Sequence, residues 1–477
     1  MDLRTKLLIG GVWTEGRDRF PTVNPATEET IAEVEEAGPE QVDAAVRSAR
    51  EAQASWRDLD PHARSELLWR LADLIEEHGS ELAEVETRDN GKPLFEAGKV
   101  DLPSVVQNFR YYAGWADKLT GETIPVSGPF LNYTLRQPVG VVGAIVPWNF
   151  PLSLAAWKVA PALACGNAVI LKPAEQTPLT ALLLGELALE AGIPAGVLNV
   201  LPGHGPVTGQ ALVEHPGVDK ISFTGSVETG KRIMREAAAT VKNITLELGG
   251  KSPNVVFADA DLDAAARGAT TGIFYGKGEV CAAGSRLYVE RSVKDAFMEK
   301  LLERASRMRP GDPTSPGTRL GALVSEEQRE KVLSYIASGK DEGAHLVAGG
   351  EAASVDGKGY FVEATVFDDV DIDMKIAREE IFGPVLSVLE FEDVDDAIRQ
   401  ANETIYGLAA GLWTRDIGRA HRFAREVQAG TVWVNTYNRY DSASPFGGFK
   451  QSGFGRDLGR HALEQYTETK SVWVALD

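Results

Sequence analysis

The 477-residue chain has only two cysteines and no long hydrophobic run, and each absence excludes a class of protein. Two cysteines cannot form the disulfide framework of a small secreted protein, so a reducing compartment is favoured. No apolar run reaches the ~18 residues of a membrane-spanning helix, and residues 1–10 lack the apolar segment of a secretion signal. We therefore expect a cytoplasmic protein that does not enter a membrane.

Positively charged residues are also fewer than negatively charged ones. Lysine and arginine total 49 against 69 aspartate and glutamate residues, which gives a net charge of -20 at pH 7. Such a surface repels phosphate backbones, so we expect no nucleic-acid partner. The rest of the composition, 43% hydrophobic and 25% charged, is that of a folded globular protein. A chain of this length is expected to form two or three domains.

Several ligand and nucleophile motifs are missing as well. The seven histidines are scattered, with no H-E-x-x-H motif and no Cys/His pairs at ligand spacing, so we expect no metal site. Neither a P-loop nor a G-x-S-x-G motif occurs. Chemistry based on a metal ion, a P-loop nucleotide or a serine nucleophile elbow is therefore not indicated.

Strand and helix signals alternate along most of the chain. Residues 1–119 are expected to be mostly helical, with an apolar stripe over 67–82 that stops at the glycine and proline of 91–93. Residues 120–138 predict a β-hairpin. Beyond residue 139, short apolar β-rich runs alternate with helices of about 10–15 residues, which predicts a parallel sheet wound on both faces.

A second α/β region follows Gly250 and extends to about residue 446. It is expected to contain a helix at 293–307 and strands at 385–391 and 432–435. The tail, 471–475, predicts a lone strand that needs a partner from elsewhere. Because an unpaired strand edge invites pairing with another chain, we expect a homodimer or a homotetramer.

Two segments are candidates for binding a phosphate-bearing cofactor. The first has glycines at 203, 205 and 209, and resembles part of a dinucleotide fingerprint, although a plain tight turn fits equally well. In the second, a strand at 220–224 leads through Gly225 and Ser226 into a helix at 227–236. The N-terminus of that helix would offer free N–H groups to a pyrophosphate, but an ordinary capped helix would look the same.

The two cysteines lie in different contexts. Cys165 is surrounded by small apolar residues and is expected to be a packing residue. Cys281 lies among glycines and alanines, which would let a thiol stand at the wall of a cleft. A thiol with a pKa near 8.5 is mostly protonated at neutral pH, so a nucleophilic role needs activation, for which Lys277 or a cofactor charge is available. On spacing alone, Cys281 could be catalytic or structural.

Seven motifs occur in the order typical of one family. They are PWNFP at 147–151, KPAEQTP at 172–178, FTGS at 223–226, LELGGK at 246–251, the segment around Cys281, EIFGP at 380–384 and PFGGFK at 445–450. Over residues 5–475 the chain resembles the aldehyde dehydrogenase superfamily. The resemblance implies NAD-dependent oxidation of an aldehyde to its carboxylic acid through a cysteine thioester, with NADP as a secondary cofactor.

The same resemblance implies roles for individual residues. Cys281 would be the nucleophile, Glu247 the general base, and Asn149 the oxyanion donor together with the backbone N–H of Cys281. Lys172 and Glu175 would hold the adenosine ribose. The implied cofactor-binding residues are Pro147, Trp148, Lys172, Glu175, Gly205, Gly209, Phe223, Gly225, Ser226, Leu248, Glu380 and Phe382, and the implied substrate-binding residues are Phe150, Trp157 and Tyr440.

The segment before the nucleophile departs from the family pattern. Many members have Asn and Gln where this chain has Gly276 and Glu279. A carboxylate at Glu279 would oppose thiolate formation at Cys281 if it were close and ionised, and Lys277 could offset it. The departure therefore bears on the pH dependence of the reaction and on cofactor affinity, and not on the class of reaction.

The expected fold is α/β, with a Rossmann-like cofactor domain, an α/β catalytic domain and a β-arm for oligomerisation. The expected boundaries are 1–119 and 139–250 for the cofactor domain, 251–448 for the catalytic domain, and 120–138 and 449–477 for the arm. One alternative is a relative that passes its acyl group to coenzyme A; such relatives usually lack the base, so Glu247 argues against it. Another is an idle structural or binding protein on the same fold, which the joint presence of Cys281, Glu247 and Asn149 disfavours.

Overall fold

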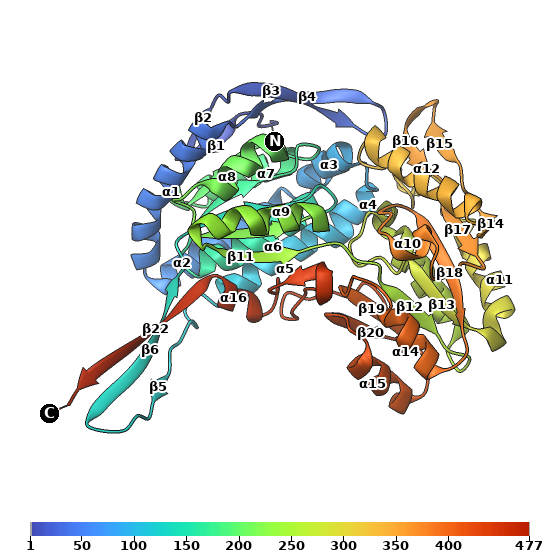
Figure 1. Cartoon of the computed structure of the whole chain (residues 1–477). Coiled ribbons are helices and arrows are strands. Elements are labelled where there is room, and N and C mark those ends of the chain that lie inside the picture. The colour runs from blue at the N-terminus through green and yellow to red at the C-terminus, as the bar shows by residue number, and fades with distance from the viewer. Residues whose placement is uncertain (1, 477) are drawn as a thin grey trace.

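Two large sheets, each covered by helices on both faces, form the body of the protein, as residues 2–476 of the computed structural model describe it (Figure 1). The first sheet has eight strands in the order β2-β1-β9-β8-β7-β10-β11-β21. Its five central strands, from β9 to β11, are parallel, and the strands at both edges are antiparallel. The bounds are Leu7–Ile9 (β1), Val12–Thr14 (β2), Val141–Ile145 (β7), Ala168–Lys172 (β8), Leu198–Val200 (β9), Lys220–Thr224 (β10), Asn243–Glu247 (β11) and Gly453–Phe454 (β21).

Neighbouring residues of the central strands face two different cores. Val142 and Ala144 of β7 pack with one set of helices, whereas Val141 and Ile145 pack with another. The first set is α2 (Pro61–Glu77), α5 (Leu102–Ala113), α6 (Pro151–Ala164) and α7 (Leu179–Glu190), and the second is α1 (Pro39–Asp58), α8 (Gln210–Glu214) and α9 (Val227–Ala237). The predicted doubly wound parallel sheet is therefore confirmed. Ligands in such sheets bind beyond the carboxyl ends of the parallel strands.

The second sheet has seven strands in the order β14-β17-β18-β13-β12-β19-β20, and only β14 is antiparallel to its neighbour. Helices α10 (Leu262–Phe274) and α11 (Lys294–Ala305) cover one face, and α12 (Glu326–Asp341), α14 (Val394–Asn402) and α15 (Ile417–Glu426) cover the other. The strand bounds are Pro253–Val256 (β12), Arg286–Glu290 (β13), His345–Ala348 (β14), Thr365–Asp368 (β17), Val385–Phe391 (β18), Ala409–Trp413 (β19) and Thr431–Val434 (β20).

A three-stranded arm extends from the body (Figure 1). The predicted hairpin is present as β5 (Thr123–Ile124) and β6 (Phe130–Pro138). The C-terminal strand, which was expected to lie in this arm and to need a partner from elsewhere, is not unpaired in the chain: β22 (Thr467–Ala475) pairs with β6 along its whole length. Residues 453–466, which were expected in the arm, lie elsewhere: β21 joins the first sheet, and α16 (His461–Gln465) contacts α6.

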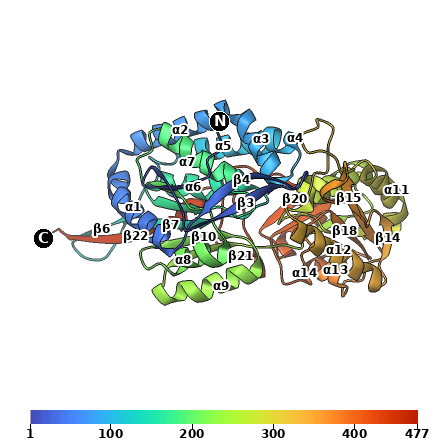
Figure 2. The ribbon, with the colours of Figure 1, turned by 90° about the horizontal axis from the view of Figure 1, so that it is seen from above.

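The N-terminal region is less helical than expected. Besides β1 and β2, it contains the antiparallel pair β3 (Asp18–Asn24) and β4 (Glu29–Glu36), which reaches from the first sheet to the second domain (Figure 2). There the turn between them accepts a hydrogen bond, from the backbone N–H of Tyr360 to the carbonyl of Pro25, 2.9 Å apart. These strands escaped prediction because they are short, or have mixed polar and apolar residues without a clean alternation.

The apolar stripe over 67–82 belongs to two helices and not to one. Helix α2 ends at Glu77, and α3 (Gly79–Asn90) follows directly. The predicted stop is confirmed, since Gly91 caps α3 with a left-handed φ of 84°. Among the helices of residues 2–476, none combines the length and the apolar character that crossing a membrane requires.

Candidate active site

The three residues with implied catalytic roles come from both domains and meet between them. Asn149 follows β7, Glu247 is the last residue of β11, and Cys281 lies in the segment between α10 and β13. The Asn149 side chain donates from Nδ2 to the backbone carbonyl of Glu279, 2.9 Å away. A Cβ on Gly250 would lie 2.4 Å from the carbonyl oxygen of Cys281. The ends of the parallel strands thus contact the nucleophile segment directly.

Cys281 is a half-buried free thiol. Burial raises its pKa to about 12, and the carboxylates of Glu380 and Glu247 raise it further. Hydrogen bonds from the backbone N–H groups of Ala282 and of Cys281 itself act in the opposite direction. In the protein alone, the thiol is therefore protonated at neutral pH, and it needs a source of activation to become a nucleophile.

Lys277 does not supply that activation. Its Nζ donates to the backbone oxygen and to Oδ1 of Asn90, at 2.8 and 2.9 Å, and lies 2.7 Å from Oε2 of Glu279. The other oxygen of Glu279 accepts a hydrogen bond from the backbone N–H of Val324. The two charges therefore neutralise each other, and the carboxylates that raise the Cys281 pKa are those of Glu380 and Glu247.

Glu247 has the properties of a carboxyl group held ready for proton transfer. Its side chain is 5% exposed, and neither oxygen has a hydrogen-bond partner within residues 2–476. Burial raises its pKa well above the usual value, Asp457 raises it further, and Lys158 opposes the shift. A Cβ on Gly447 would lie 2.7 Å from Oε1, so the site has no room for a larger residue there.

A cleft of about 260 Å³ lies at the carboxyl ends of the first sheet. All the residues implied for the cofactor line it except Leu248, Glu380 and Phe382. Ser226 caps α9 through its Oγ, which accepts from the N–H of Thr229, so this helix is both a capped helix and one wall of the cleft. Lys172 is buried, donates to Glu175 at 3.3 Å, and has a pKa lowered chiefly by burial.

The cleft has the shape and chemistry that an adenine dinucleotide needs. Gly205 and Gly209 line it, and no atom lies within 4 Å of the position that a Cβ on Gly205 would take. The N-terminus of α9 adds free N–H groups and the positive end of a helix dipole. Sequence reasoning missed the contribution of Thr229, Arg232 and Ile233, whose three- and four-residue spacing marks one face of α9.

The three remaining implied residues lie beyond that cleft. Oε1 of Glu380 accepts from the N–H of Gly250 at 2.9 Å, and burial raises the pKa of this carboxyl to about 7. The Phe382 ring meets the Trp148 ring edge-on at 5.2 Å. Both residues thus continue the cleft from Trp148 toward Cys281. Leu248 is buried, and a Cβ on Gly230 of α9 would lie 2.7 Å from its side chain. Leu248 therefore packs directly against this helix.

Aromatic rings form a wall near Cys281. Trp157 lies 6.2 Å from Tyr440 and 5.5 Å from Phe446, measured between ring centroids. Phe150 stacks on Tyr275 at 6.1 Å. Cys281, Phe150 and Trp157 pack against the same apolar cluster, which contains Phe446, and the exposed ring of Tyr440 meets Phe446 edge-on at 5.5 Å. The structure thus groups the three implied substrate residues and adds Tyr275 and Phe446, which the sequence analysis did not select.

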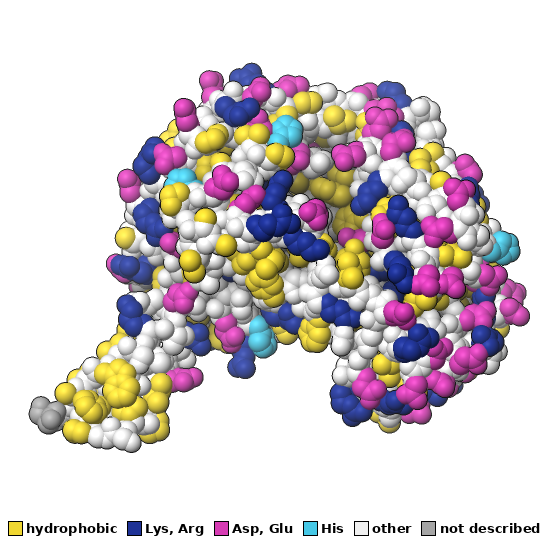
Figure 3. Space-filling view, in the orientation of Figure 1, with side chains coloured by type: hydrophobic (Ala, Val, Ile, Leu, Met, Phe, Trp, Pro, Cys, Tyr) yellow, Lys and Arg dark blue, Asp and Glu magenta, His cyan; other side chains and the backbone are white. Residues whose placement is uncertain are grey.

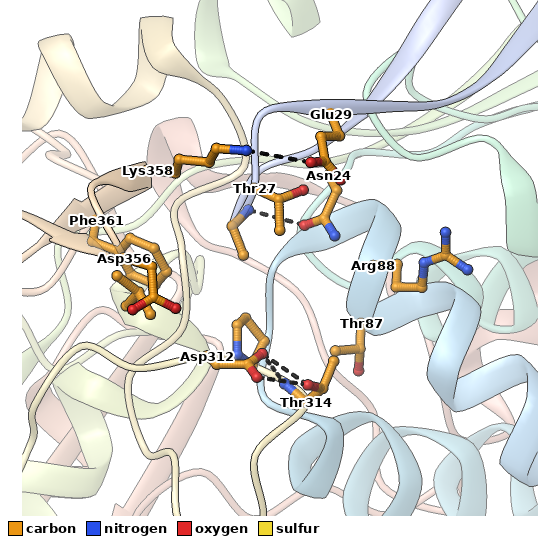
Figure 4. A pocket seen from close by; sticks show the side chains of 13 residues that line it. Asn24, Thr27, Glu29, Thr87, Arg88, Asp312, Thr314, Asp356, Lys358 and Phe361 are labelled. Atoms are coloured by element: carbon orange, nitrogen blue, oxygen red, sulfur yellow. Dashed lines mark hydrogen bonds and ion pairs between the residues drawn. The ribbon is translucent and has the colours of Figure 1, made fainter.

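A second cavity, of about 420 Å³, lies apart from the candidate active site and is larger than the cleft described above (Figure 4). It is enclosed by the β3–β4 turn, α3, the loop at 312–314 and the hairpin of β15 (Ala352–Val355) and β16 (Lys358–Val362). An ion pair between Lys358 and Glu29, 3.3 Å apart, lies at its edge. None of the residues implied for catalysis or cofactor binding lines it.

Known proteins resemble this chain over almost its whole length. The model of the aldehyde dehydrogenase family matches residues 13–472. The chain belongs to the aldehyde dehydrogenase family. The DhaS protein of Bacillus subtilis (strain 168) is 54% identical over 476 residues, which are 99% of this chain and 96% of that protein. Human retinal dehydrogenase 2 is 49% identical over 478 residues, which are 99% of this chain and 92% of that protein.

Solved aldehyde dehydrogenase structures have the same fold. An NAD+ complex of the Bacillus cereus aldehyde dehydrogenase superposes with a TM-score of 0.98 at 51% identity, covering 99% of this chain and 97% of that one. A P. syringae indole-3-acetaldehyde dehydrogenase, in complex with NAD+ and IAA, gives a TM-score of 0.98 at 48% identity, with coverage of 100% and 97%. The expected aldehyde dehydrogenase fold is therefore confirmed.

Proposed function

We propose that this aldehyde dehydrogenase oxidises an aldehyde to its carboxylic acid with NAD, through a thiohemiacetal and a thioester on Cys281. The observation that carries the proposal is the meeting of a thiol, an amide donor and a buried carboxyl near a cleft lined by the N-terminus of α9 and by Gly205 and Gly209. Similarity to a Bacillus cereus enzyme that binds NAD+ supports the choice of cofactor.

In the first step the Cys281 thiol releases its proton to solvent, and the resulting thiolate adds to the aldehyde carbon, which turns the carbonyl oxygen into an alkoxide. One N–H of the Asn149 amide is used by the Glu279 carbonyl, and the second is free to donate to this alkoxide together with the Cys281 backbone N–H. NAD, when bound, supplies the acceptor for a hydride from the substrate carbon. Loss of that hydride leaves a thioester on the sulfur.

The second step is hydrolysis of the thioester, which needs a water molecule made nucleophilic. Glu247 is the carboxylate next to Cys281 that can take the proton of this water. Its raised pKa makes it a stronger base than an exposed glutamate once it is ionised. This base supports hydrolysis over acyl transfer to coenzyme A.

We infer that NAD is preferred over NADP. Glu175 lines the cleft and is paired with Lys172. Its carboxylate can accept hydrogen bonds from ribose hydroxyls but repels the phosphate that distinguishes NADP.

We infer that the substrate is an uncharged aldehyde of medium size, aliphatic or aromatic. The wall formed by Phe150, Trp157 and Tyr440 is apolar, and the small Ala282 next to the nucleophile leaves space. Arg439 is exposed near this wall and would favour a carboxylate-bearing aldehyde instead. Comparing neutral with carboxylate-bearing aldehydes, in the protein and in Arg439→Ala, separates the two.

We infer that the arm joins copies of this chain into a homodimer or a homotetramer. Hydrophobic side chains gather on the arm (Figure 3). Those exposed include Phe130, Leu131, Leu135, Trp473 and Val474. Strand β22 is the outer strand of its sheet, so its free edge can pair with another strand. Light scattering after gel filtration gives the mass of the assembly, and a monomer would contradict the inference.

NADH formation with a panel of aliphatic, aromatic, amino- and carboxy-aldehydes tests the proposed function. The expected result is NADH and free carboxylic acid in equal amounts, without any need for coenzyme A. Acyl-coenzyme A as the product would identify an acyl-transferring relative. The absence of NADH with every aldehyde, by a folded protein that binds NAD, would identify an idle protein.

A further inference from the structure

The segment that precedes the nucleophile has an unusual backbone. Gly276 and Lys277 both lie in the left-handed region, with φ values of 56° and 62°. A glycine adopts this conformation freely, whereas a lysine does so only when its surroundings hold it there. Lys277 is 1% exposed, so the groups that hold it are inside the protein.

Lys277 connects this segment to the first domain. Its Nζ donates twice to Asn90, the last residue of α3, and lies 2.7 Å from the carboxylate of Glu279. Glu279 is in turn fixed by the N–H of Val324, 3.0 Å from its other oxygen. A buried ammonium and a buried carboxylate of opposite charge need each other, because either one alone would be costly to bury.

Both ends of this arrangement reach Asn149. Asn90 donates from Nδ2 to the backbone carbonyl of Trp148 at 2.7 Å, which fixes the main chain just before Asn149. The backbone carbonyl of Glu279 accepts from Nδ2 of Asn149 at 2.9 Å, which fixes its side chain. Asn90 therefore holds the residue before Asn149, and Glu279, two residues before Cys281, holds the Asn149 side chain.

We propose that Asn90, Lys277 and Glu279 are positioning residues that aim the amide of Asn149 at the oxygen of a substrate bound to Cys281. This proposal rests on the proposed function, because Asn149 acts as an oxyanion donor only if Cys281 adds to an aldehyde. Donors held in place before the reaction stabilise an oxyanion far better than donors that must reorient. The Glu279 carbonyl uses one amide proton and so sets the direction of the other.

The proposal predicts which steps depend on Lys277. Hydride transfer passes through an alkoxide, so it should slow when the amide is no longer aimed. Alkylation of Cys281 by iodoacetamide creates no oxyanion. Without Lys277 the buried Glu279 takes up a proton, because burial raises its pKa, so it adds no charge near the thiol and the alkylation rate should not change. General disorder of the nucleophile segment would alter both rates together.

Lys277→Met is the first test, with Lys294→Met as the matched control. Lys294 is also a largely buried lysine in an ion-pair cluster, with Asp368, Asp369 and Glu390, but it lies at the start of α11 and contacts none of the site residues. In Lys277→Met the single-turnover NADH burst should slow by about tenfold to a hundredfold, somewhat less than loss of an oxyanion donor usually costs. The KM for aldehyde and the alkylation rate should stay at their wild-type values, and Lys294→Met should keep the wild-type burst.

A double-mutant cycle with Asn149→Ala decides whether Lys277 acts through the amide. If it does, Lys277→Met should slow the burst little further once Asn149 is gone, because residues that act as a unit are not additive. Additive losses, or equal losses in burst and alkylation, would overturn the proposal. A wild-type protein that makes no NADH would instead overturn the proposed function.

Asn90→Ala provides a second variant in case Lys277→Met fails to fold. It removes the side-chain link to Lys277 and the link to the Trp148 carbonyl, and it leaves the hydrogen bond from Lys277 to the backbone oxygen at position 90. The ion pair with Glu279 also stays intact, so no buried charge loses its partner. The expected result is the same slow burst with a normal alkylation rate. A wild-type burst in Asn90→Ala would overturn the proposal.

Discussion

Lys158 donates to Asp457 at 2.9 Å, and both side chains are buried next to Glu247. Their charges act on that carboxyl in opposite directions: Asp457 raises the pKa of Glu247, and Lys158 lowers it. Burial is the largest cause of the raised pKa of Glu247, and the pair adjusts the pH at which this carboxyl becomes a base. Removing one member should move that pH in a known direction.

In Asp457→Asn, the rise on the acid side of the pH–rate profile of thioester hydrolysis should move to lower pH. With the negative charge gone and Lys158 still present, the pKa of Glu247 falls, because a nearby like charge no longer opposes its ionisation. Hydrolysis requires ionised Glu247, so its rate should reach its plateau at a lower pH. The pH dependence of the step after the NADH burst measures this, with Asp369→Asn as a distant control. A rise that stays at the same pH, or that moves to higher pH, would contradict the expectation.

Alkylation of Cys281 by iodoacetamide in the protein without cofactor should accelerate steadily up to high pH. Burial raises the pKa of the thiol to about 12, and only the thiolate reacts. Below its pKa the thiolate fraction rises about tenfold per pH unit, so no plateau is expected between pH 7 and pH 9. Mass spectrometry of the labelled protein follows the reaction, and the buried Cys165 should stay unlabelled throughout. A plateau in this range would show that another group already ionises the thiol.

Glu175→Gln should narrow the preference for NAD over NADP. The substitution keeps an acceptor for a ribose hydroxyl and removes the charge that repels a phosphate. A like-charge contact at a partly buried site costs several kcal/mol, so the ratio of kcat/KM values should narrow by at least about tenfold. Steady-state kinetics with both cofactors gives the ratio. An unchanged ratio would mean that Glu175 does not contact the ribose.

Lys92→Met should destabilise the protein, and more so at high pH. Lys92 is fully buried between Glu86, at 3.1 Å, and Asp101, at 2.6 Å. Removing one partner of a buried ion pair typically costs about 3–5 kcal/mol. Without Lys92, Glu86 takes up a proton in the folded state, because burial already raises its pKa. When a group has a higher pKa in the folded state than in the unfolded state, the protein loses stability as the pH rises. The loss of stability in Lys92→Met should therefore be larger at pH 9 than at pH 6.

Chemical unfolding at the two pH values measures the loss in Lys92→Met. Lys118→Met is the control, since Lys118 forms an exposed pair with Asp117 that is expected to contribute little. Equal losses at both pH values would show that Glu86 does not take up a proton in the folded variant.

The sequence was sufficient for the parallel strands but not for the edges of the sheets. Strands β7 and β8 are buried on both faces and therefore appear as unbroken apolar runs. Strands β1 and β2 have three residues each, which is too few for a pattern. The pairing of β22 with β6 could not be predicted from local pattern, because Thr467 pairs with Pro138 across more than half of the chain, and only the family resemblance placed the two segments in one arm. Local periodicity carries no information about such a distant pairing.

The candidate active site was likewise predicted only in part. The motifs pointed to Cys281, Glu247 and Asn149, and the structure brings these residues together. The pairing of Lys277 with Glu279 was considered only as a possible offset of charge near the thiol. That these residues turn toward Asn90 depends on the left-handed backbone at 276–277, which no sequence pattern displayed. The cleft residues on α9 were missed because helix periodicity marks a face without saying what it faces.

Cys281 and Glu247 should fail at different steps when each is replaced. Cys281→Ala cannot form a thiohemiacetal, so neither NADH nor a covalent adduct should appear. Glu247→Gln keeps the shape of the side chain and removes the proton acceptor for the hydrolytic water. Loss of a general base typically costs about a hundredfold to ten-thousandfold. One equivalent of NADH should therefore form, after which the enzyme should stall as a thioester.

Rapid mixing of Glu247→Gln with aldehyde and NAD, followed by intact mass measurement, tests this division. The burst should persist, and the mass should rise by that of the acyl group on Cys281. Replacing Glu247 also removes a negative charge that raises the Cys281 pKa, so the thiol should ionise more easily and the burst should not slow. An absent burst with no adduct would mean that Glu247 is needed before hydride transfer, as the base that deprotonates Cys281. In that case the main role of Glu247 would be to deprotonate the Cys281 thiol, whose pKa is raised, and not to activate water for hydrolysis.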